Sequence, residues 1–90
     1  MNRDRRKRLS AAIGLLNSAK ESLESAVEIV QEVHDEEEES YDNLPEGVQE
    51  SERGEAMQEN VDSLDDILSE LDIADTIEEQ IDAIQEVIDR

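Results

Sequence analysis

The chain has 90 residues, of which 27 are acidic and eight are lysine or arginine, and its formal net charge is −19. This excess of negative charge disfavours direct binding to DNA, RNA or anionic lipid, because phosphates are repelled, and it favours a basic partner or high solubility. The sequence contains no Cys, Phe or Trp, which excludes disulfides and thiolate chemistry, leaves an aliphatic core and suits a reducing cytoplasm.

Residues 1–8 form a basic head that carries five of the eight lysine and arginine residues. The apolar stretch that follows is short and is interrupted by Asn17 and Lys20, so we expect neither a signal peptide nor a membrane span. We expect the head to form weak, exposed ion pairs with acidic residues near the end of the chain. These residues are Glu78, Glu79, Asp82, Glu86 and Asp89.

Residues 9–42 have the apolar spacing of a long helix. From Leu9 onwards the seam positions alternate in steps of four and three, which is a heptad pattern. Lys20 and His34 also fall on this seam. Lys20 either fixes the register of helix packing or extends its charge into solvent. His34 is either a packed histidine or a pH-sensitive contact with its acidic neighbours.

A turn is predicted at 43–51, where the sequence contains its only proline and the first of two closely spaced glycines. Asn43 with Glu46 fits a capping box, and Ser51 is a second candidate N-cap. The segments before and after this turn are similar in length. One short connection between two equal arms predicts an antiparallel helical hairpin.

Residues 52–90 continue with a second heptad series, which is interrupted by two successive steps of three, from Leu71 through Ala74 to Ile77. The second helix is therefore either one bent helix or two helices that meet near 73–76. Two candidate capping boxes lie at this point: Asp75 with Glu78, and Thr76 with Glu79.

Taken together, residues 1–90 are expected to form one all-α domain, because no strand-like alternation occurs anywhere in the sequence. Apolar residues outside the main seams need cover from a third helix or from a second copy of the chain. We therefore favour a homodimer that forms a helical bundle. The residues assigned to the core and to self-association are Leu16, Leu23, Val27, Val30, Leu64, Leu68, Leu71, Ile77, Ile81 and Ile84.

Acidic residues concentrate in the middle of the chain, where Glu28 to Asp62 includes fourteen acidic residues and one basic residue, Arg53. Five successive acids, Asp35–Glu39, lie at the end of the first helix, where the helix dipole favours cations. Helix stability therefore does not explain them, and either solvation or a basic partner must. The candidate partner-binding residues are Glu32, Asp35, Glu36, Glu37, Glu38, Glu39, Asp42, Glu46, Glu50, Glu52, Glu55 and Glu59.

An enzyme is not expected. The chain has one histidine, no cysteine and no glycine-rich phosphate loop, and a thin helical protein offers little concavity to shift a carboxyl pKa. The motif Gln31–His34 lacks the glutamate of the di-iron Glu-x-x-His signature, and no EF-hand spacing occurs. We therefore predict no catalytic residue, no metal and no cofactor.

Three interpretations of the acidic residues remain open. They form a solvated face, they bind a basic protein groove, or they imitate the phosphates of a nucleic acid. Helical carboxylates repeat about every 5 Å along one face, and a duplex strand carries a phosphate about every 3.4 Å. Two acidic helices side by side would approximate a phosphate track in the basic channel of a nuclease or effector.

The stretch NLPEGVQESERGEAMQENVDSLDDILSEL, from Asn43 to Leu71, resembles a region of small helical proteins encoded by phages and prophages of Gram-positive bacteria. The Leu-Pro turn and Met57 are its most specific parts, and it covers about a third of the chain. The resemblance implies a mobile-element origin, and with it a place in the cytoplasm of an infected or lysogenic bacterial host. Such an origin favours the third interpretation, in which the protein inhibits a host defence protein such as a restriction or CRISPR nuclease. The resemblance assigns no functional residue. The alternative function is a structural or assembly coiled coil that acts through its apolar seams.

Overall fold

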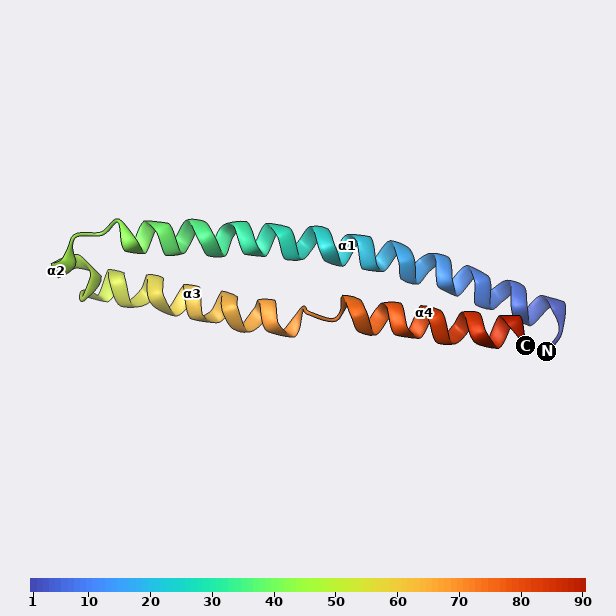
Figure 1. Cartoon of the computed structure of the whole chain (residues 1–90). Helices are drawn as coiled ribbons and strands as arrows, with labels where there is room; N and C mark the ends of the chain where they lie inside the picture. Colours follow the sequence, from blue (N-terminus) through green and yellow to red (C-terminus); the bar gives the residue numbers. More distant parts are fainter. The chain divides into compact units, whose positions relative to one another are not determined.

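The computed structural model describes all 90 residues, and every regular element in it is a helix. The helices are α1 (Arg3–Asp42), α2 (Glu46–Gln49), α3 (Glu52–Glu70) and α4 (Ala74–Asp89) (Figure 1). The all-α prediction is therefore confirmed. None of these helices combines the length and the apolar character that crossing a membrane requires.

Helix α1 begins at Arg3, six residues earlier than predicted, so the basic head is its first part. The side chain of Asn2 explains this start, because its Oδ1 accepts a hydrogen bond from the backbone N–H of Arg5 at 2.9 Å. A side chain in this role satisfies one of the N–H groups that a helix leaves without a partner at its beginning. Asp4 adds an acidic residue in the first turn, where the helix dipole favours it.

The predicted turn at 43–51 contains a short helix, α2. The capping box predicted for Asn43 and Glu46 is wrong, because Pro45 is the N-cap residue of α2 and no side chain caps it. Instead, the backbone carbonyl of Pro45 accepts the N–H groups of Val48 and Gln49 at 2.8 and 3.0 Å. Proline fixes its own φ angle, so the backbone can start this one-turn helix without a polar cap.

The start of α3 agrees with the sequence, because Ser51 is its N-cap and its hydroxyl accepts from the N–H of Gly54 at 3.5 Å. Gly54 is buried, and a Cβ atom at this position would overlap the backbone carbonyl of Gln49. A residue without a side chain is therefore required where the first turn of α3 meets α2. The sequence alone marked this glycine only as a weak helix former.

Gln49 closes the end of α1 through its side chain. Its Nε2 donates to the carbonyl of Tyr41 at 3.1 Å and lies 3.5 Å from the carbonyl of Asp42. The last carbonyls of a helix have no partner within the helix, so this amide satisfies acceptors at the end of α1. Sequence reasoning missed this contact, because no motif connects a glutamine to a helix that ended seven residues earlier.

Of the two alternatives for residues 52–90, the structure has two helices, with α3 ending at Glu70 and α4 beginning at Ala74. Both predicted capping boxes near 73–76 are wrong, because the N-cap residue is Ile73 and no side chain caps it. The first turn of α4 closes through the N–H of Ile77, which donates to the carbonyl of Ile73 at 3.1 Å. The candidate caps Asp75 and Thr76 lie inside the helix, two and three residues after the N-cap position.

The chain divides into two compact units, and unit 1 comprises Met1–Ser25 and Asp72–Arg90. It contains the first part of α1 and the whole of α4. Lys20 Nζ donates to Glu78 Oε2 at 3.0 Å, and the Lys20 side chain is three-quarters covered. This contact favours a register-fixing role for Lys20. The predicted core residues of unit 1 are all half-buried: Leu16, Leu23, Ile77, Ile81 and Ile84.

Unit 2 comprises Ala26–Leu71, with the rest of α1 and all of α2 and α3. Val61 is the one buried apolar side chain in the chain, with 5% of its surface exposed. The sequence placed it on the seam without distinguishing it from its neighbours. The predicted core residues of this unit are half-buried: Val27, Val30, Leu64, Leu68 and Leu71. The single domain, the hairpin and the dimeric bundle stay predictions.

Candidate functional site

The negative charge belongs mainly to unit 2. Its 46 residues include 17 acidic residues and one arginine, Arg53, so its formal net charge is −16. Unit 1 has ten acidic and seven basic residues, which gives −3. Nearly all of the chain's charge of −19 is therefore carried by about half of its residues.

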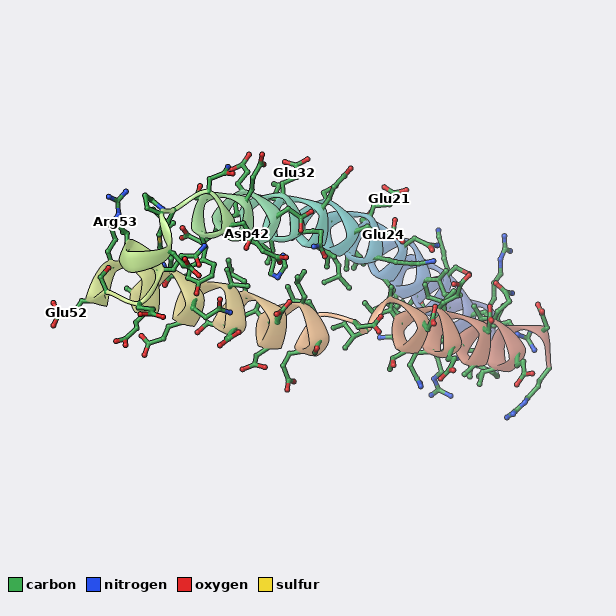
Figure 2. The ribbon with its side chains drawn as sticks, turned by 60° about the vertical axis from the view of Figure 1, so that its left-hand side comes forward. Glu21, Glu24, Glu32, Asp42, Glu52 and Arg53 are labelled. Atoms are coloured by element: carbon green, nitrogen blue, oxygen red, sulfur yellow. The ribbon has the colours of Figure 1, made fainter.

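All of the predicted partner-binding residues lie in unit 2, and every one except Glu37 is exposed. Figure 2 shows Glu32 on α1 and Glu52 at the start of α3 with their carboxylates pointing away from the ribbon. Glu37 is half-buried, and its Oε2 accepts a hydrogen bond from Asn60 Nδ2 at 3.2 Å. We call these residues the acidic surface: Glu32, Asp35, Glu36, Glu37, Glu38, Glu39, Asp42, Glu46, Glu50, Glu52, Glu55 and Glu59.

The helix termini compensate only part of the acidic surface. Glu46, Glu52 and Glu55 lie in the first turns of α2 and α3, where the helix dipole favours acidic residues, but the acids at the end of α1 have no such support. The last turn of α1 contains no basic residue, and neither does the last turn of α3. The partial negative charge of a helix C-terminus adds to the field of carboxylates nearby. Arg53 forms no ion pair. The electrostatic field that unit 2 presents to solvent is therefore strongly negative.

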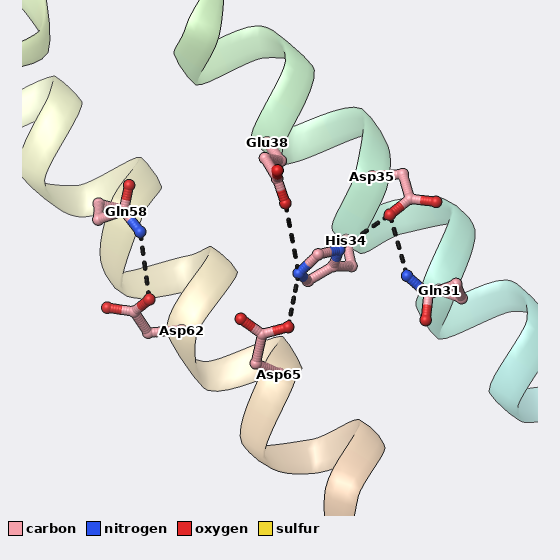
Figure 3. A network of polar contacts seen from close by, with 7 residues as sticks. All are labelled: Gln31, His34, Asp35, Glu38, Gln58, Asp62 and Asp65. Carbon is pink, nitrogen blue, oxygen red and sulfur yellow. Dashed lines mark hydrogen bonds and ion pairs between the residues drawn. The ribbon is translucent and has the colours of Figure 1, made fainter.

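His34 is the one buried polar or charged side chain in the protein, with 7% of its surface accessible, and it does not belong to the acidic surface. Its Nδ1 lies 3.0 Å from Asp35 Oδ1, and its Nε2 lies 2.7 Å from Asp65 Oδ1 and 3.7 Å from Glu38 Oε2 (Figure 3). The Nε2 atom forms no aligned hydrogen bond, so its contact with Asp65 is an ion pair defined by distance. Because Asp65 belongs to α3, the imidazole connects α1 to α3.

The carboxylates around His34 change its acidity. The hydrogen bond with Asp35 is the largest cause that raises the pKa of His34, the charges of Asp65 and Glu38 add to it, and burial opposes them. The pKa of Asp35 is lowered by its hydrogen bond with His34 and by a second one from Gln31 Nε2 at 2.9 Å. These contacts favour the pH-sensitive interpretation of His34.

One further carboxylate near the histidine has a different partner. Asp62 Oδ1 accepts a hydrogen bond from Gln58 Nε2 at 3.1 Å, both residues belonging to α3 (Figure 3). No ion pair joins Asp62 to His34. Asp62 and Asp65 therefore lie on the same helix in different environments, which makes Asp62 a natural control for Asp65.

The ion pairs predicted between the basic head and the end of the chain do not form. The only ion pair of the head is local, between Arg8 Nε and Asp4 Oδ2 at 3.4 Å, and both side chains are exposed. Glu78 contacts Lys20 instead. An exposed ion pair contributes little once the two side chains must be held in place, so solvated arginine side chains are not drawn towards α4.

An open hollow beside α1 is lined by Val33, Glu36, Glu37 and Ser40. The structure contains no group of three or more His, Asp or Glu side chains arranged to hold a metal ion. What unit 2 presents to solvent is mainly the exposed carboxylates of the acidic surface.

Fold and charge together define the class of the protein as an all-α chain with a concentrated acidic surface. A scan against protein-family models found no match, and neither the curated proteins nor the solved structures contained one.

Proposed function

We propose that the chain is a non-enzymatic protein-binding module whose acidic surface occupies a basic surface of another protein. The observation that carries this proposal is the net charge of −16 in unit 2. All residues of the acidic surface except one are exposed, so this charge faces solvent. A concentrated field of this kind attracts cationic partners and raises their association rate.

The partner class that fits best is a protein that normally binds nucleic acid. On α1, the exposed residues Glu32, Glu36 and Glu39 follow one another by four and three positions, so their carboxylates repeat about every 5 Å on one helix face. A channel built to bind phosphates presents the complementary charge. In its most specific form, the protein is a phage-encoded nucleic-acid mimic that inhibits a restriction or CRISPR nuclease in the host cytoplasm.

An antiparallel hairpin would bring acids of α3 beside those of α1. Within unit 2, Glu37 contacts Asn60 and His34 contacts Asp65, so the paired positions advance along α3 as they retreat along α1. Within unit 1, Lys20 contacts Glu78. These contacts support the hairpin and give a second row of carboxylates on the same protein.

The experiment is a DNA-cleavage assay with one restriction endonuclease and one Cas nuclease. The test variant replaces four exposed acids that form no hydrogen bond or ion pair: Glu32→Gln, Glu36→Gln, Glu39→Gln and Glu59→Gln. Its matched control neutralises four exposed acids of unit 1: Glu79→Gln, Asp82→Asn, Glu86→Gln and Asp89→Asn. Both variants have the same net charge, so only the position of the removed charge differs.

We expect the wild type and the unit 1 control to slow cleavage, and the unit 2 variant to lose this effect with its helical circular dichroism unchanged. Inhibition should also weaken steeply as salt is added, because salt screens exposed charges. If both variants lose inhibition to the same extent, inhibition depends on net charge alone and not on the acidic surface. Cleavage that proceeds unchanged with the wild type would remove the nuclease-inhibitor form, and failure to bind an oligo-arginine peptide would remove the whole proposal.

The second candidate is a structural or assembly protein that acts through its apolar residues as a homodimeric bundle. Its specific support is that one apolar side chain is buried while Leu15 and Ile29 on α1 are 73% and 61% exposed. Helices with such faces gain stability when a partner covers them. Light scattering should then report a dimer for the wild type, a monomer for Leu15→Glu with Ile29→Glu, and a dimer for the exposed control Ser22→Glu.

A further inference from the structure

His34 connects the acidic surface to the packing of unit 2. It lies at the contact between α1 and α3, and two of its carboxylate neighbours, Asp35 and Glu38, belong to the acidic surface. We propose that the proton on His34 regulates this surface: the charged imidazole holds Asp35, Glu38 and Asp65, and the neutral imidazole releases their charge to a basic partner. The regulation of binding depends on the proposed function, whereas the proton-dependent contact between the helices does not.

The geometry requires two protons on the ring for both of its close contacts to be favourable. Nδ1 and Nε2 each face a carboxylate oxygen, at 3.0 Å and 2.7 Å, and an ionised carboxylate can only accept hydrogen bonds. A neutral imidazole has one N–H group and one acceptor nitrogen. In that state, one ring nitrogen would carry no proton for the carboxylate oxygen beside it, and the attraction between the charged ring and the carboxylates would be lost.

No other cation can replace His34 at this position. The charged groups that face the ring are Asp35 and Glu38 from α1 and Asp65 from α3, and the one arginine of unit 2 forms no ion pair with any of them. Three carboxylates therefore share one titratable cation that is nearly enclosed. Loss of its proton leaves them to repel one another across the contact between the helices.

This arrangement gives two opposite responses to pH. As the pH rises and His34 loses its proton, the contact between α1 and α3 weakens and unit 2 becomes less stable. At the same time, the acidic surface becomes more negative and its affinity for a cationic partner rises. A histidine that is merely packed in the core would produce neither response.

The first test is an NMR titration of the imidazole, which is unambiguous because the chain has one histidine. In Asp65→Asn, the pKa of His34 should fall towards its ordinary value, and in Glu38→Gln, where the distance is longer, it should fall less. Asp62→Asn, with its carboxylate bonded to Gln58, should leave it unchanged. A pKa that does not move in Asp65→Asn, or that moves equally in Asp62→Asn, would overturn the proposal.

The second test measures binding of an oligo-arginine peptide between about pH 5.5 and about pH 8, because arginine keeps its charge throughout this range. The wild type should bind a few-fold more tightly at the upper end, and His34→Gln should show no such trend. If His34→Gln does not fold, Asp65→Asn serves as a second variant, in which the pH dependence of peptide binding should be weaker than in the wild type. Binding that is independent of pH in the wild type would overturn the regulation while leaving the proposed function intact, and the NMR result stands even if the peptide does not bind.

Discussion

Units 1 and 2 are built from the same kind of heptad-spaced helix and differ in charge and burial. Unit 1 is close to neutral at −3, has no buried residue and joins its helices through the ion pair of Lys20 and Glu78, in which only the glutamate is exposed. Unit 2 has a net charge of −16 and contains the chain's buried residues, His34, Gly54 and Val61.

The comparison shows that this helical architecture does not require an acidic surface. Unit 1 forms its helices with a nearly balanced set of charges, so helix formation alone does not require the accumulation of acids in unit 2. Unit 2 also contains the tighter packing, which holds the acidic surface against its own repulsion. Variants that remove the special packing of unit 2, or the ion pair that joins α1 to α4 in unit 1, test this difference.

The largest expected effect is that of Gly54→Ala. The added Cβ would overlap the backbone carbonyl of Gln49, and backbone cannot yield as a flexible side chain does, so we expect a destabilisation of about 1–3 kcal/mol, the usual cost of overpacking. Urea denaturation followed by circular dichroism measures it.

The matched control for Gly54→Ala is Gly14→Ala in unit 1. Gly14 is exposed in α1, and a Cβ there meets nothing within 4 Å, so alanine should stabilise the helix by about 0.5–1 kcal/mol. Equal responses to the two substitutions would show that the contact between α2 and α3 is looser than the structure indicates.

Val61→Ala should have the next largest effect. Val61 is the only buried apolar side chain, and the loss of its two methyl groups should cost about 2 kcal/mol through lost burial and the cavity left behind. Val87→Ala, at a half-buried position in unit 1, should cost less than about 1 kcal/mol. The difference between the two midpoints in urea measures how unequal the packing of the units is.

Much of this organisation could be predicted from the sequence, because it follows from periodicity along one chain. The helices, the break near Ile73 and the cap at Ser51 each depend on residues a few positions apart. The missed features depend on side chains that meet across elements or at helix ends. The contact of Gln49 with the end of α1 does not follow from any periodic pattern in the sequence. The same is true of the close approach of Gly54 to α2.

The candidate site was predictable in composition and less so in geometry. The acidic surface follows from the sequence because exposed charges need no partner to be placed. His34 could be assigned to the seam, but its contact with Asp65 depends on the register between two helices. The prediction that the basic head forms ion pairs with acidic residues near the end of the chain was wrong. Side chains of opposite charge that lie in the same region need not contact each other when both are solvated.

The third prediction concerns pH, and its direction differs for the two groups involved. The pKa of His34 is raised above the ordinary value of 6.5, so its contribution to stability is complete below that pH and is lost as the pH rises through the raised value. The pKa of Asp35 is lowered below 3.8, so its contribution is complete above that pH and is lost as the pH falls through the lowered value. Both contributions are present together between about pH 4 and about pH 6.5.

Melting curves of the wild type and His34→Gln measure this effect. Their difference in melting temperature should be largest inside that window and should shrink as the medium becomes alkaline. Amide hydrogen exchange of His34→Gln should show reduced protection near Val61 in unit 2 and unchanged protection at Ile81 in unit 1. A difference that stays constant with pH would show that His34 stabilises unit 2 by packing alone.

The smallest expected effect is that of Lys20→Gln, which removes the ion pair that joins α1 to α4 in unit 1. The pKa of Lys20 is raised first by its hydrogen bond with Glu78, so its stabilising contribution is complete below 10.5 and is lost only above that value. The pair should therefore persist across the pH range in which His34 loses its proton. Because Glu78 is exposed, raising the salt concentration from about 0.1 M to about 1 M should bring the wild type and Lys20→Gln to the same stability. A difference that survives high salt would mean that the covered stem of Lys20 contributes through packing, and unit 1 would then resemble unit 2 in using a polar seam residue to hold its helices.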